Sequence, residues 1–415
     1  MKQVQYVLPD SWAWKTLEDV SEKITDGTHH SPKVQFSEWE PGRFKYITSK
    51  NIKNSGMKLD NISYIDQDTH SNIYTRCPPE IDDQLLTKDG AMTGTCCLNE
   101  LDEPFSLLSS VALIKQKRSI ILPKYLNYYL QSQVGQNFLL GDISGAAITR
   151  TNIKKLKGTP VPLAPFSEQE RIVEKLNALL NRIDIAIEHL QESASLADAL
   201  YASSLDQVFE KVYLDYSTEP LSTLANKIGS GATPKGGQKA YKESGVSLIR
   251  SLNVHDLEFK PAGLAFIDDD QAEKLRNVVV ERGDVLLNIT GASIARCCVA
   301  PNEYLPARVN QHVCIIRPTL ELDSLYLNYL LTSPKFKALL LFQGAGGATR
   351  QALTKVMVSN LDIPRPPLEE QVKLVDKMNL LCKKNRDLKE QINSKVFDLI
   401  TLKSSILDSA FKGEL

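Results

Sequence analysis

The chain has 415 residues, too many for one ordinary hydrophobic core, which predicts at least two domains. A hydrophobic fraction of 42% and a charged fraction of 24% are typical of a globular protein and exclude a disordered one. No apolar run reaches the roughly 20 residues that span a membrane, and the net charge of −1 means that any nucleic-acid-binding surface must be local. Seven cysteines without a CxxC spacing, and an N-terminus without a signal-peptide core, predict a cytoplasmic protein without disulfides or a zinc site.

The first half opens with short runs typical of strands. Residues 46–48, 61–65 and 111–114 are rich in β-branched and aromatic side chains and are bounded by turn residues. Residues 124–134 have the pattern of an amphipathic helix. We therefore predict a compact α+β domain over residues 1–160.

A long helix is predicted over the next segment, 161–214. The proline run at 160–165 cannot be helical, and Ser167 with Glu170 forms an S-x-x-E capping box. Neither Pro nor Gly occurs between Ser167 and Leu214. Small or apolar residues recur there at coiled-coil spacing, and they are Leu176, Leu180, Ile183, Ile187, Leu190, Ala194, Ala197, Tyr201, Ser204 and Val208.

The second half repeats this plan, with a domain over 215–363 and a helix in 364–415. Strand-like runs at 285–289 and 313–316 and a helix at 324–331 precede Pro364, Pro366 and Pro367. The predicted seam of the last helix, interrupted by Asn385 and Lys395, consists of Met378, Leu381, Leu388, Ile392, Leu399, Leu402 and Ile406.

The two halves are copies of one sequence. The Tyr-Leu-Asn-Tyr segment 125–132 returns 201 residues later at 326–333. Gly90-Ala91, Cys96-Cys97, Thr149-Arg150 and Glu168-Gln169 return as Gly291-Ala292, Cys297-Cys298, Thr349-Arg350 and Glu370-Gln371. The halves differ most over 24–46 and 228–248, so one scaffold carries two different sets of loops.

Each long helix needs a partner for its seam. Helices of about 45 residues are about 68 Å long, longer than a domain of this size is wide. The other helix of the same chain is the economical partner, and homodimeric coiled-coil arms are the alternative.

Motifs for catalysis are missing from the sequence. It contains no GxxxxGK[ST], no GxGxxG after a strand, no nucleophile elbow, and no Asn-Pro-Pro-Tyr or Asp-Pro-Pro-Tyr of an amino-methyltransferase. These absences favour a binding protein over a fused methyltransferase or nuclease. A scaffold that binds protein rather than DNA is the third possibility.

Several ordered blocks together resemble one known family. They are Trp12-x-Trp14-x-x-Leu17-x-x-Val20, residues 24–29, the two Tyr-Leu-Asn-Tyr segments, the proline-to-helix junctions 162–172 and 364–374, and the ending 405–415. Over nearly its whole length the chain resembles the DNA specificity subunit of type I restriction–modification systems.

This resemblance implies a fold and a division of labour. Each half looks like a target-recognition domain that reads one half of a bipartite site in double-stranded DNA. The helices look like an intramolecular antiparallel coiled coil with a pseudo-twofold repeat, which sets the spacing and docks two methyltransferase subunits. The chain itself would be non-catalytic and bind no cofactor. S-adenosylmethionine would belong to the methyltransferase subunits, and ATP and Mg to the restriction (translocase) subunits.

DNA-contacting residues are predicted from side-chain type and from the divergence between the halves. Arg, Asn and Gln suit base edges, while Lys, Thr and Ser suit phosphates. In the first half the candidates are Thr25, Thr28, His29, His30, Lys33, Lys50, Asn51 and Arg150. In the second half they are Thr233, Lys235, Lys239, Arg250, Asn253, Arg350 and Gln351. The alternative is that the matched pairs Asn51/Asn253 and Arg150/Arg350 stabilise turns common to both halves.

Overall fold

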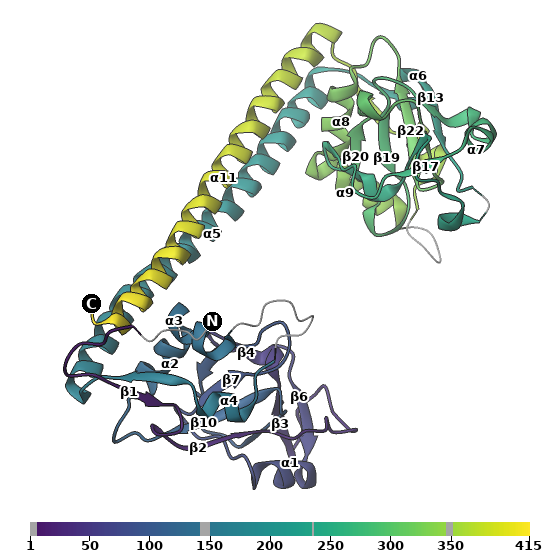
Figure 1. Cartoon of the computed structure of the whole chain (residues 1–415). Helices are drawn as coiled ribbons and strands as arrows, with labels where there is room; N and C mark the ends of the chain where they lie inside the picture. Colours follow the sequence, from purple (N-terminus) through teal and green to yellow (C-terminus); the bar gives the residue numbers. More distant parts are fainter. Residues whose placement is uncertain (1–5, 142–149, 235, 346–351) are drawn as a thin grey trace. The chain divides into compact units, whose positions relative to one another are not determined.

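The computed structural model describes residues 6–141, 150–234, 236–345 and 352–415. Its contacts divide the chain into two compact units, Met1–Leu190 with Ser394–Leu415, and Gln191–Asn393. We call these the first and the second unit. Each long helix contributes one part to each unit (Figure 1). None of the described helices has a stretch apolar enough to cross a membrane.

Two sheets form the body of the first unit. One is antiparallel with the order β2-β10-β7-β8, and the other has the order β6-β3-β9 with β3 and β9 parallel. The strands of these sheets are β2 (Ser21–Asp26), β3 (Arg43–Ile47), β6 (Ser63–Asp66), β7 (Gln84–Thr87), β8 (Cys96–Leu98), β9 (Phe105–Leu107) and β10 (Val111–Gln116). Two-stranded pairs are made by β1 (Ala13–Thr16) with β11 (Pro160–Leu163) and by β4 (Ile52–Lys53) with β5 (Gly56–Met57). The helices are α1 (Gln67–Tyr74), α2 (Pro123–Gln131), α3 (Gln133–Leu140), α4 (Ile153–Lys157) and the 3-10 turn η1 (Ser49–Asn51).

The second unit repeats this topology. Its antiparallel sheet has the order β13-β22-β19-β20, and its second sheet is β17-β14-β21-β18. The strands are β13 (Ala225–Ser230), β14 (Val246–Ile249), β17 (Ala265–Ile267), β18 (Val279–Val280), β19 (Val285–Asn288), β20 (Cys297–Val299), β21 (Ala307–Val309) and β22 (Val313–Pro318). Two-stranded pairs join β12 (Thr218–Pro220) to β23 (Asp362–Pro364) and β15 (Val254–His255) to β16 (Glu258–Phe259). The helices and 3-10 turns are α6 (Leu221–Leu224), η2 (Gly237–Ala240), η3 (Ser251–Asn253), α7 (Asp269–Lys274), η4 (Arg276–Val278), η5 (Gly291–Ser293), η6 (Asn302–Tyr304), α8 (Ser324–Thr332), α9 (Pro334–Gly344) and α10 (Lys355–Ser359). The predicted duplication and α+β class are therefore confirmed.

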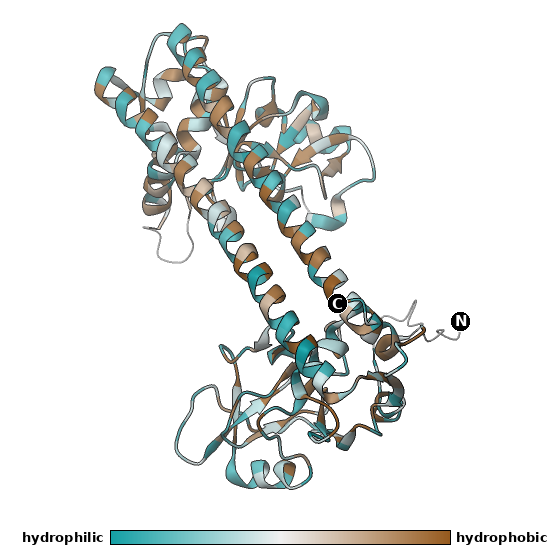
Figure 2. Cartoon of the chain, turned by 90° about the vertical axis from the view of Figure 1, so that its left-hand side faces the viewer, coloured by the Kyte–Doolittle hydropathy of each residue, from teal (hydrophilic) through white to brown (hydrophobic). Residues whose placement is uncertain are grey.

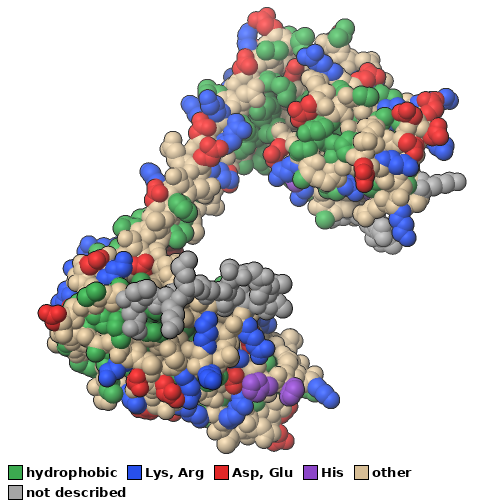
Figure 3. All heavy atoms as spheres, in the orientation of Figure 1, with side chains coloured by type: hydrophobic (Ala, Val, Ile, Leu, Met, Phe, Trp, Pro, Cys, Tyr) green, Lys and Arg blue, Asp and Glu red, His purple; other side chains and the backbone are tan. Residues whose placement is uncertain are grey.

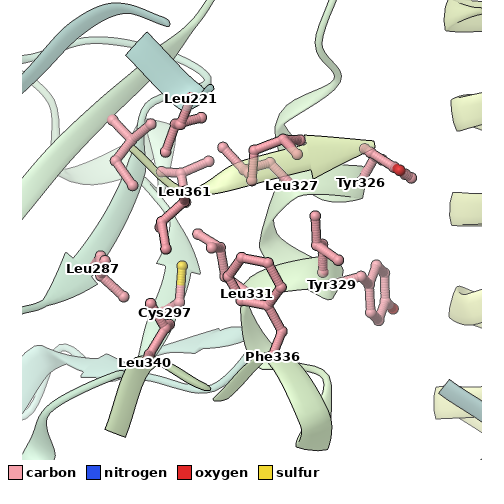
Figure 4. Packing of buried hydrophobic residues seen from close by; sticks show 14 of the residues in the cluster. Leu221, Leu287, Cys297, Tyr326, Leu327, Tyr329, Leu331, Phe336, Leu340 and Leu361 are labelled. Atoms are coloured by element: carbon pink, nitrogen blue, oxygen red, sulfur yellow. The ribbon is translucent and has the colours of Figure 1, made fainter. Parts of the chain in front are cut away.

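The repeated tyrosines join each domain to the long helix that follows it. Tyr125 on α2 donates a hydrogen bond to the carbonyl of Pro162 at 2.8 Å, and Tyr326 on α8 donates to Pro364 at 2.9 Å. One turn later along each helix, Tyr128 and Tyr329 donate to the side-chain oxygens of Asn177 and Asn379, at 2.6 and 2.8 Å. Figure 4 shows Tyr326 and Tyr329 beside the apolar cluster formed with Leu327, Leu331 and Phe336.

A buried glutamine fixes the start of each long helix. The Gln169 amide donates to the carbonyls of Ile120 and Ala164, at 3.0 and 2.9 Å, and accepts from the Leu122 N–H at 2.8 Å. Gln371 makes the same three bonds to the carbonyls of Glu321 and Pro366 and the N–H of Asp323. Neither side chain is accessible to solvent. We call each set the glutamine clasp.

The two long helices, α5 (Phe166–Asp215) and α11 (Leu368–Lys412), run antiparallel inside each unit. In the first unit Lys403 Nζ lies 2.7 Å from Asp184 Oδ1, and Arg171 donates to the carbonyl of Leu415. In the second unit Asp198 accepts from Lys389 and Asn385, at 2.7 and 3.0 Å. The predicted pairing within one chain is confirmed, and α5 begins one residue before the predicted Ser167.

The predicted seam is right for α5 and partly wrong for α11. All ten predicted seam residues of α5 are buried or half-buried. On α11 Leu388 and Leu402 are exposed, and the next positions along the helix, Lys389 and Lys403, pair with α5 instead. The apolar pattern misplaced this seam because charged and amide side chains lie on it. Figure 2 shows hydrophilic and hydrophobic residues interspersed along both helices.

Candidate nucleic-acid interface

One edge of the antiparallel sheet gathers polar side chains in both units. In the first unit β2 and β7 end at this edge and β10 begins there, because β10 pairs antiparallel with both, with Asp26 opposite Ala112 and Thr87 opposite Val111. In the second unit β13, β19 and β22 meet in the same way, with Ser230 opposite Cys314. The loops whose sequences diverge most leave from the ends of β2 and β13. We call this place the loop edge.

At the loop edge of the first unit the polar groups form a charged network. Lys88 is only 3% exposed, and its Nζ lies 3.4 Å from Asp26 and 3.3 Å from Asp89. Arg76 lies 2.8 Å from the other oxygen of Asp26. A buried ammonium requires such partners, because desolvation would otherwise favour its neutral form.

This network holds one arginine out into solvent. Arg150 Nε lies 2.8 Å from Asp89 Oδ1, while 70% of the Arg150 side chain is exposed. His29 lies on the other side of the network, 3.6 Å from Asp26, and it is exposed. Figure 3 shows histidine and basic side chains gathered on this face of the first unit. An oriented, exposed guanidinium is suited to the bidentate recognition of a guanine or a phosphate.

At the loop edge of the second unit the equivalent groups are neutral. An isolated bridge joins Asp89 to Arg150 in the first unit, and the matching bridge joins Thr290 to Ala352 in the second. The carboxylate of Asp89 is thus replaced by the hydroxyl of Thr290, and the guanidinium of Arg150 by the methyl group of Ala352. The two bridges also show that the sequence match of Arg150 with Arg350 is wrong. In the folded repeat the position of Arg150 corresponds to that of Ala352.

A directional chain of hydrogen bonds replaces the ion pairs. Gln311 Nε2 lies 3.0 Å from His312 Nε2, and the other ring nitrogen of His312 bonds to the Thr290 hydroxyl. The hydroxyl of Thr233 donates to the Gln311 carbonyl oxygen. The side chains of Thr233, Gln311, His312 and Thr290 are thus joined by hydrogen bonds in one continuous chain.

The second loop edge is also hollowed. A cavity of about 650 Å³ is lined by residues of η3, η5 and their neighbours, among them Ser251, Thr290, Arg296 and His312. Arg296 contributes the positive charge of this hollow. The two copies therefore present different hydrogen-bonding and charge patterns from one scaffold position.

The remaining candidates of the first half fall into three groups. Thr28, His30 and Lys33 lie in the loop after β2, where the Thr28 hydroxyl donates to the His30 carbonyl at 3.0 Å. Thr25 is half-buried on β2, opposite Leu113. Lys50 is exposed on η1.

The matched asparagines Asn51 and Asn253 are buried and bound to backbone. Asn51 accepts from the Thr48 N–H at 3.0 Å and donates to the Lys58 carbonyl at 3.0 Å. Asn253 makes the same pair of bonds to the residues at the matching positions. These amides have no exposed edge for DNA, so the alternative that they stabilise a turn common to both halves is favoured.

The other second-half candidates are spread around the unit. Lys239 is exposed on η2. Arg250 is half-buried, donates to the Gly263 carbonyl and lies over the ring of Tyr241. Lys235, Arg350 and Gln351 lie outside the described residues.

Sequence reasoning missed seven members of the two networks, namely Asp26, Arg76, Lys88, Asp89, Thr290, Gln311 and His312. One signal was present. The Gly90-Ala91 and Gly291-Ala292 match is directly preceded by Lys88-Asp89 in one copy and by Ile289-Thr290 in the other. A change from charged to neutral residues beside a matched glycine marks a divergent site on a common backbone.

The described residues offer little for metal or nucleophilic chemistry. No group of three or more His, Cys, Asp or Glu side chains among them is arranged to hold a metal ion. All seven cysteines are free thiols, and burial raises the pKa of Cys97 and Cys298 to about 12. A thiol with so high a pKa is a poor nucleophile at neutral pH.

A duplicated α+β scaffold, with unlike polar groups at one equivalent edge, defines a two-part recognition protein. Residues 9–196 and 221–397 both match the family model for the type I restriction modification DNA specificity domain. The chain belongs to this family.

Curated relatives and solved structures agree with this assignment. The EcoBI specificity subunit of Escherichia coli is 24% identical over 98% of this chain and 86% of its own length. The MjaVIII specificity subunit of Methanocaldococcus jannaschii is 23% identical over 77% of this chain and 78% of its own length.

Two solved structures share the fold. A chain from work on complex assembly and conformational transition of the type I R-M system has a TM-score of 0.76 at 22% identity, covering 99% of this chain and 100% of that chain. The HsdS subunit from Thermoanaerobacter tengcongensis has a TM-score of 0.56 at 22% identity, with 100% of both chains covered.

Proposed function

We propose that the chain is the sequence-specific DNA-recognition subunit of a type I restriction–modification complex. Each unit reads one half of a bipartite target through its loop edge. The observation that carries this proposal is the contrast between the charged network of the first unit and the neutral network of the second. Two copies of one scaffold with unlike donors and acceptors are suited to two unlike base sequences.

The partners and cofactors follow from this role. The paired helices set the spacing between the half-sites and dock two methyltransferase subunits, to which the duplicated scaffold offers two similar surfaces. The chain does no chemistry itself. S-adenosylmethionine is held by the methyltransferase subunits, and ATP and Mg by the restriction subunits.

Binding to random-sequence DNA at several salt concentrations tests the DNA-binding role. The logarithm of the binding constant of the purified chain, with and without a methyltransferase subunit, should fall linearly with the logarithm of the salt concentration. The slope should be about −0.9 for each phosphate contacted. An affinity independent of salt would contradict the role and would support a scaffold that binds protein. Methylation by the chain alone, with S-adenosylmethionine added, would support a fused enzyme.

Arg150 is expected to specify bases in one half-site. Arg150→Ala should weaken binding to the cognate site about 5- to 150-fold, which corresponds to the loss of about 1–3 kcal/mol for a bidentate base contact. Methylome sequencing should then show degeneracy in one half of the target only. Arg118→Ala is the matched control, because Arg118 is an exposed, acid-paired arginine that follows the opposite end of β10. Equal weakening on every sequence would show that Arg150 contacts only phosphate.

A further inference from the structure

The second unit has an apolar groove beside the end of α5. A cavity of about 530 Å³ lies between this end of α5 and the helices α8 and α9. Its apolar walls are formed by Phe209, Leu330, Phe336 and Leu339, and its rim carries Asp206, Glu210 and Lys335. We call this the α8–α9 groove. Figure 3 shows hydrophobic side chains gathered over the second unit beside the long helices.

The first unit contains the counterpart of this groove. Asp206 accepts a hydrogen bond from the Lys335 N–H, and Asp408 accepts one from the Val134 N–H in the same way. The ring of Phe209 lies 5.8 Å from that of Tyr326. The ring of Phe411 lies 5.2 Å from that of Tyr125. The end of α11 with α2 and α3 therefore repeats the end of α5 with α8 and α9.

In the first unit this counterpart is filled by the N-terminal segment. Tyr6 donates a hydrogen bond to the Phe411 carbonyl, and its ring lies 5.0 Å from that of Trp14. Trp14 also lies 5.8 Å from Phe138 on α3. Pro9 packs so closely on Gly413 that a Cβ there would lie 2.3 Å from it. Two aromatic rings on one N-terminal segment, which turns between Pro9 and Trp12, thus cover this apolar surface.

The second unit lacks both rings. Trp14 is paired with Pro162, and the residue paired with the matching Pro364 is Thr218. Only two residues separate the end of α5 at Asp215 from the start of β12 at Thr218, so no free segment precedes that strand. Phe342, one turn beyond Leu339 on α9, is 81% exposed, and Leu214 on the groove wall is 86% exposed. An apolar surface of this kind marks an interaction site.

We propose that the α8–α9 groove binds a peptide segment of another protein, anchored by an aromatic side chain. The filled counterpart shows the kind of occupant that this surface accepts. The two grooves differ in one backbone hydrogen-bond acceptor. The Phe411 carbonyl lies in the last turn of α11 and is free to accept from Tyr6, whereas α5 continues to Asp215, so the Phe209 carbonyl is inside the helix. The anchor of the second groove therefore needs no hydroxyl, and phenylalanine or tryptophan suits it.

A fluorescent peptide with the sequence of residues 1–16 is the probe, and the full chain is the target. We expect saturable binding of one peptide per chain. Tyr6→Phe in the peptide should bind at least as well, and Trp14→Ala should bind at least tenfold more weakly. In the chain, Leu339→Glu should weaken binding at least tenfold. Leu341→Glu is the matched control, because Leu341 has a similar exposure on the same helix but does not line the groove.

Three results would overturn the proposal. Equal binding by the Leu339→Glu and Leu341→Glu chains would exclude the groove. A photo-crosslinker at peptide position 6 that reacts only with Phe138 or Phe411 would show exchange into the first unit instead. A dimer of the full chain that Leu339→Glu dissociates, measured by sedimentation, would identify the occupant as a second copy of this chain.

Discussion

Gln371→Ala is expected to lower the free energy of unfolding by about 3–4 kcal/mol, and Gln169→Ala by a similar amount. Each substitution removes three hydrogen bonds inside the glutamine clasp and leaves buried backbone groups without partners. Each lost bond contributes about 0.5–1.5 kcal/mol, and an unsatisfied buried group costs more. Because the clasp joins a long helix to its domain, the helix start should lose amide-exchange protection as well.

Urea unfolding of the full chain, followed by circular dichroism, measures this effect. Glu369→Ala is the control, since Glu369 is exposed near the same helix start and pairs with the exposed Lys373. An exposed pair of this kind contributes about 0.3–0.5 kcal/mol. If Gln371→Ala were no more destabilising than Glu369→Ala, the clasp would not be what fixes the helix to the domain.

Gly231→Ala is expected to destabilise the second unit by about 3 kcal/mol and to displace the loop that carries Thr233. A Cβ at Gly231 would lie 1.7 Å from the Val309 carbonyl oxygen, so the backbone itself would have to move. Gly27 has the same relation to Leu107 in the first unit, at 1.8 Å. Forced overpacking costs about 1–3 kcal/mol, and a clash with backbone lies at the upper end.

Gly229→Ala provides the control for this substitution. Gly229 lies two residues earlier on β13, and a Cβ there would meet nothing within 4 Å. Thermal unfolding and DNA binding should both be impaired by Gly231→Ala and nearly unchanged by Gly229→Ala. Equal behaviour of the two variants would mean that the loop edge adapts to the added methyl group. The close approach of Gly231 to the Val309 backbone would then not be needed.

Local and repeated patterns allowed most of the fold to be predicted. The prolines at 160–165 and the uninterrupted run after them located α5 to within one residue. The recurring Tyr-Leu-Asn-Tyr segments located α2 and α8. Each of these features depends on residues that are close together in the sequence, and each occurs in both halves of the chain.

The candidate site was harder to predict because its partners are distant in sequence. Lys88 is buried between its neighbour Asp89 and Asp26, and Asp26 lies 62 positions earlier in the chain. Asn51 has the side-chain chemistry that recognises a base edge. Its amide group, however, is hydrogen-bonded to the backbone of Thr48 and Lys58. Similarly, no hydrophobic pattern could reveal that Lys389 and Lys403 lie on the helix seam, since their partners Asp198 and Asp184 are on the other helix.

The two units should read two half-sites independently. An exchange of residues 215–360 for the equivalent part of a relative with a different target, followed by sequencing of the host methylome, tests this independence. We predict that one half of the methylated sequence changes while the other half stays the same. A change in both halves, or in neither, would contradict independent reading by two units.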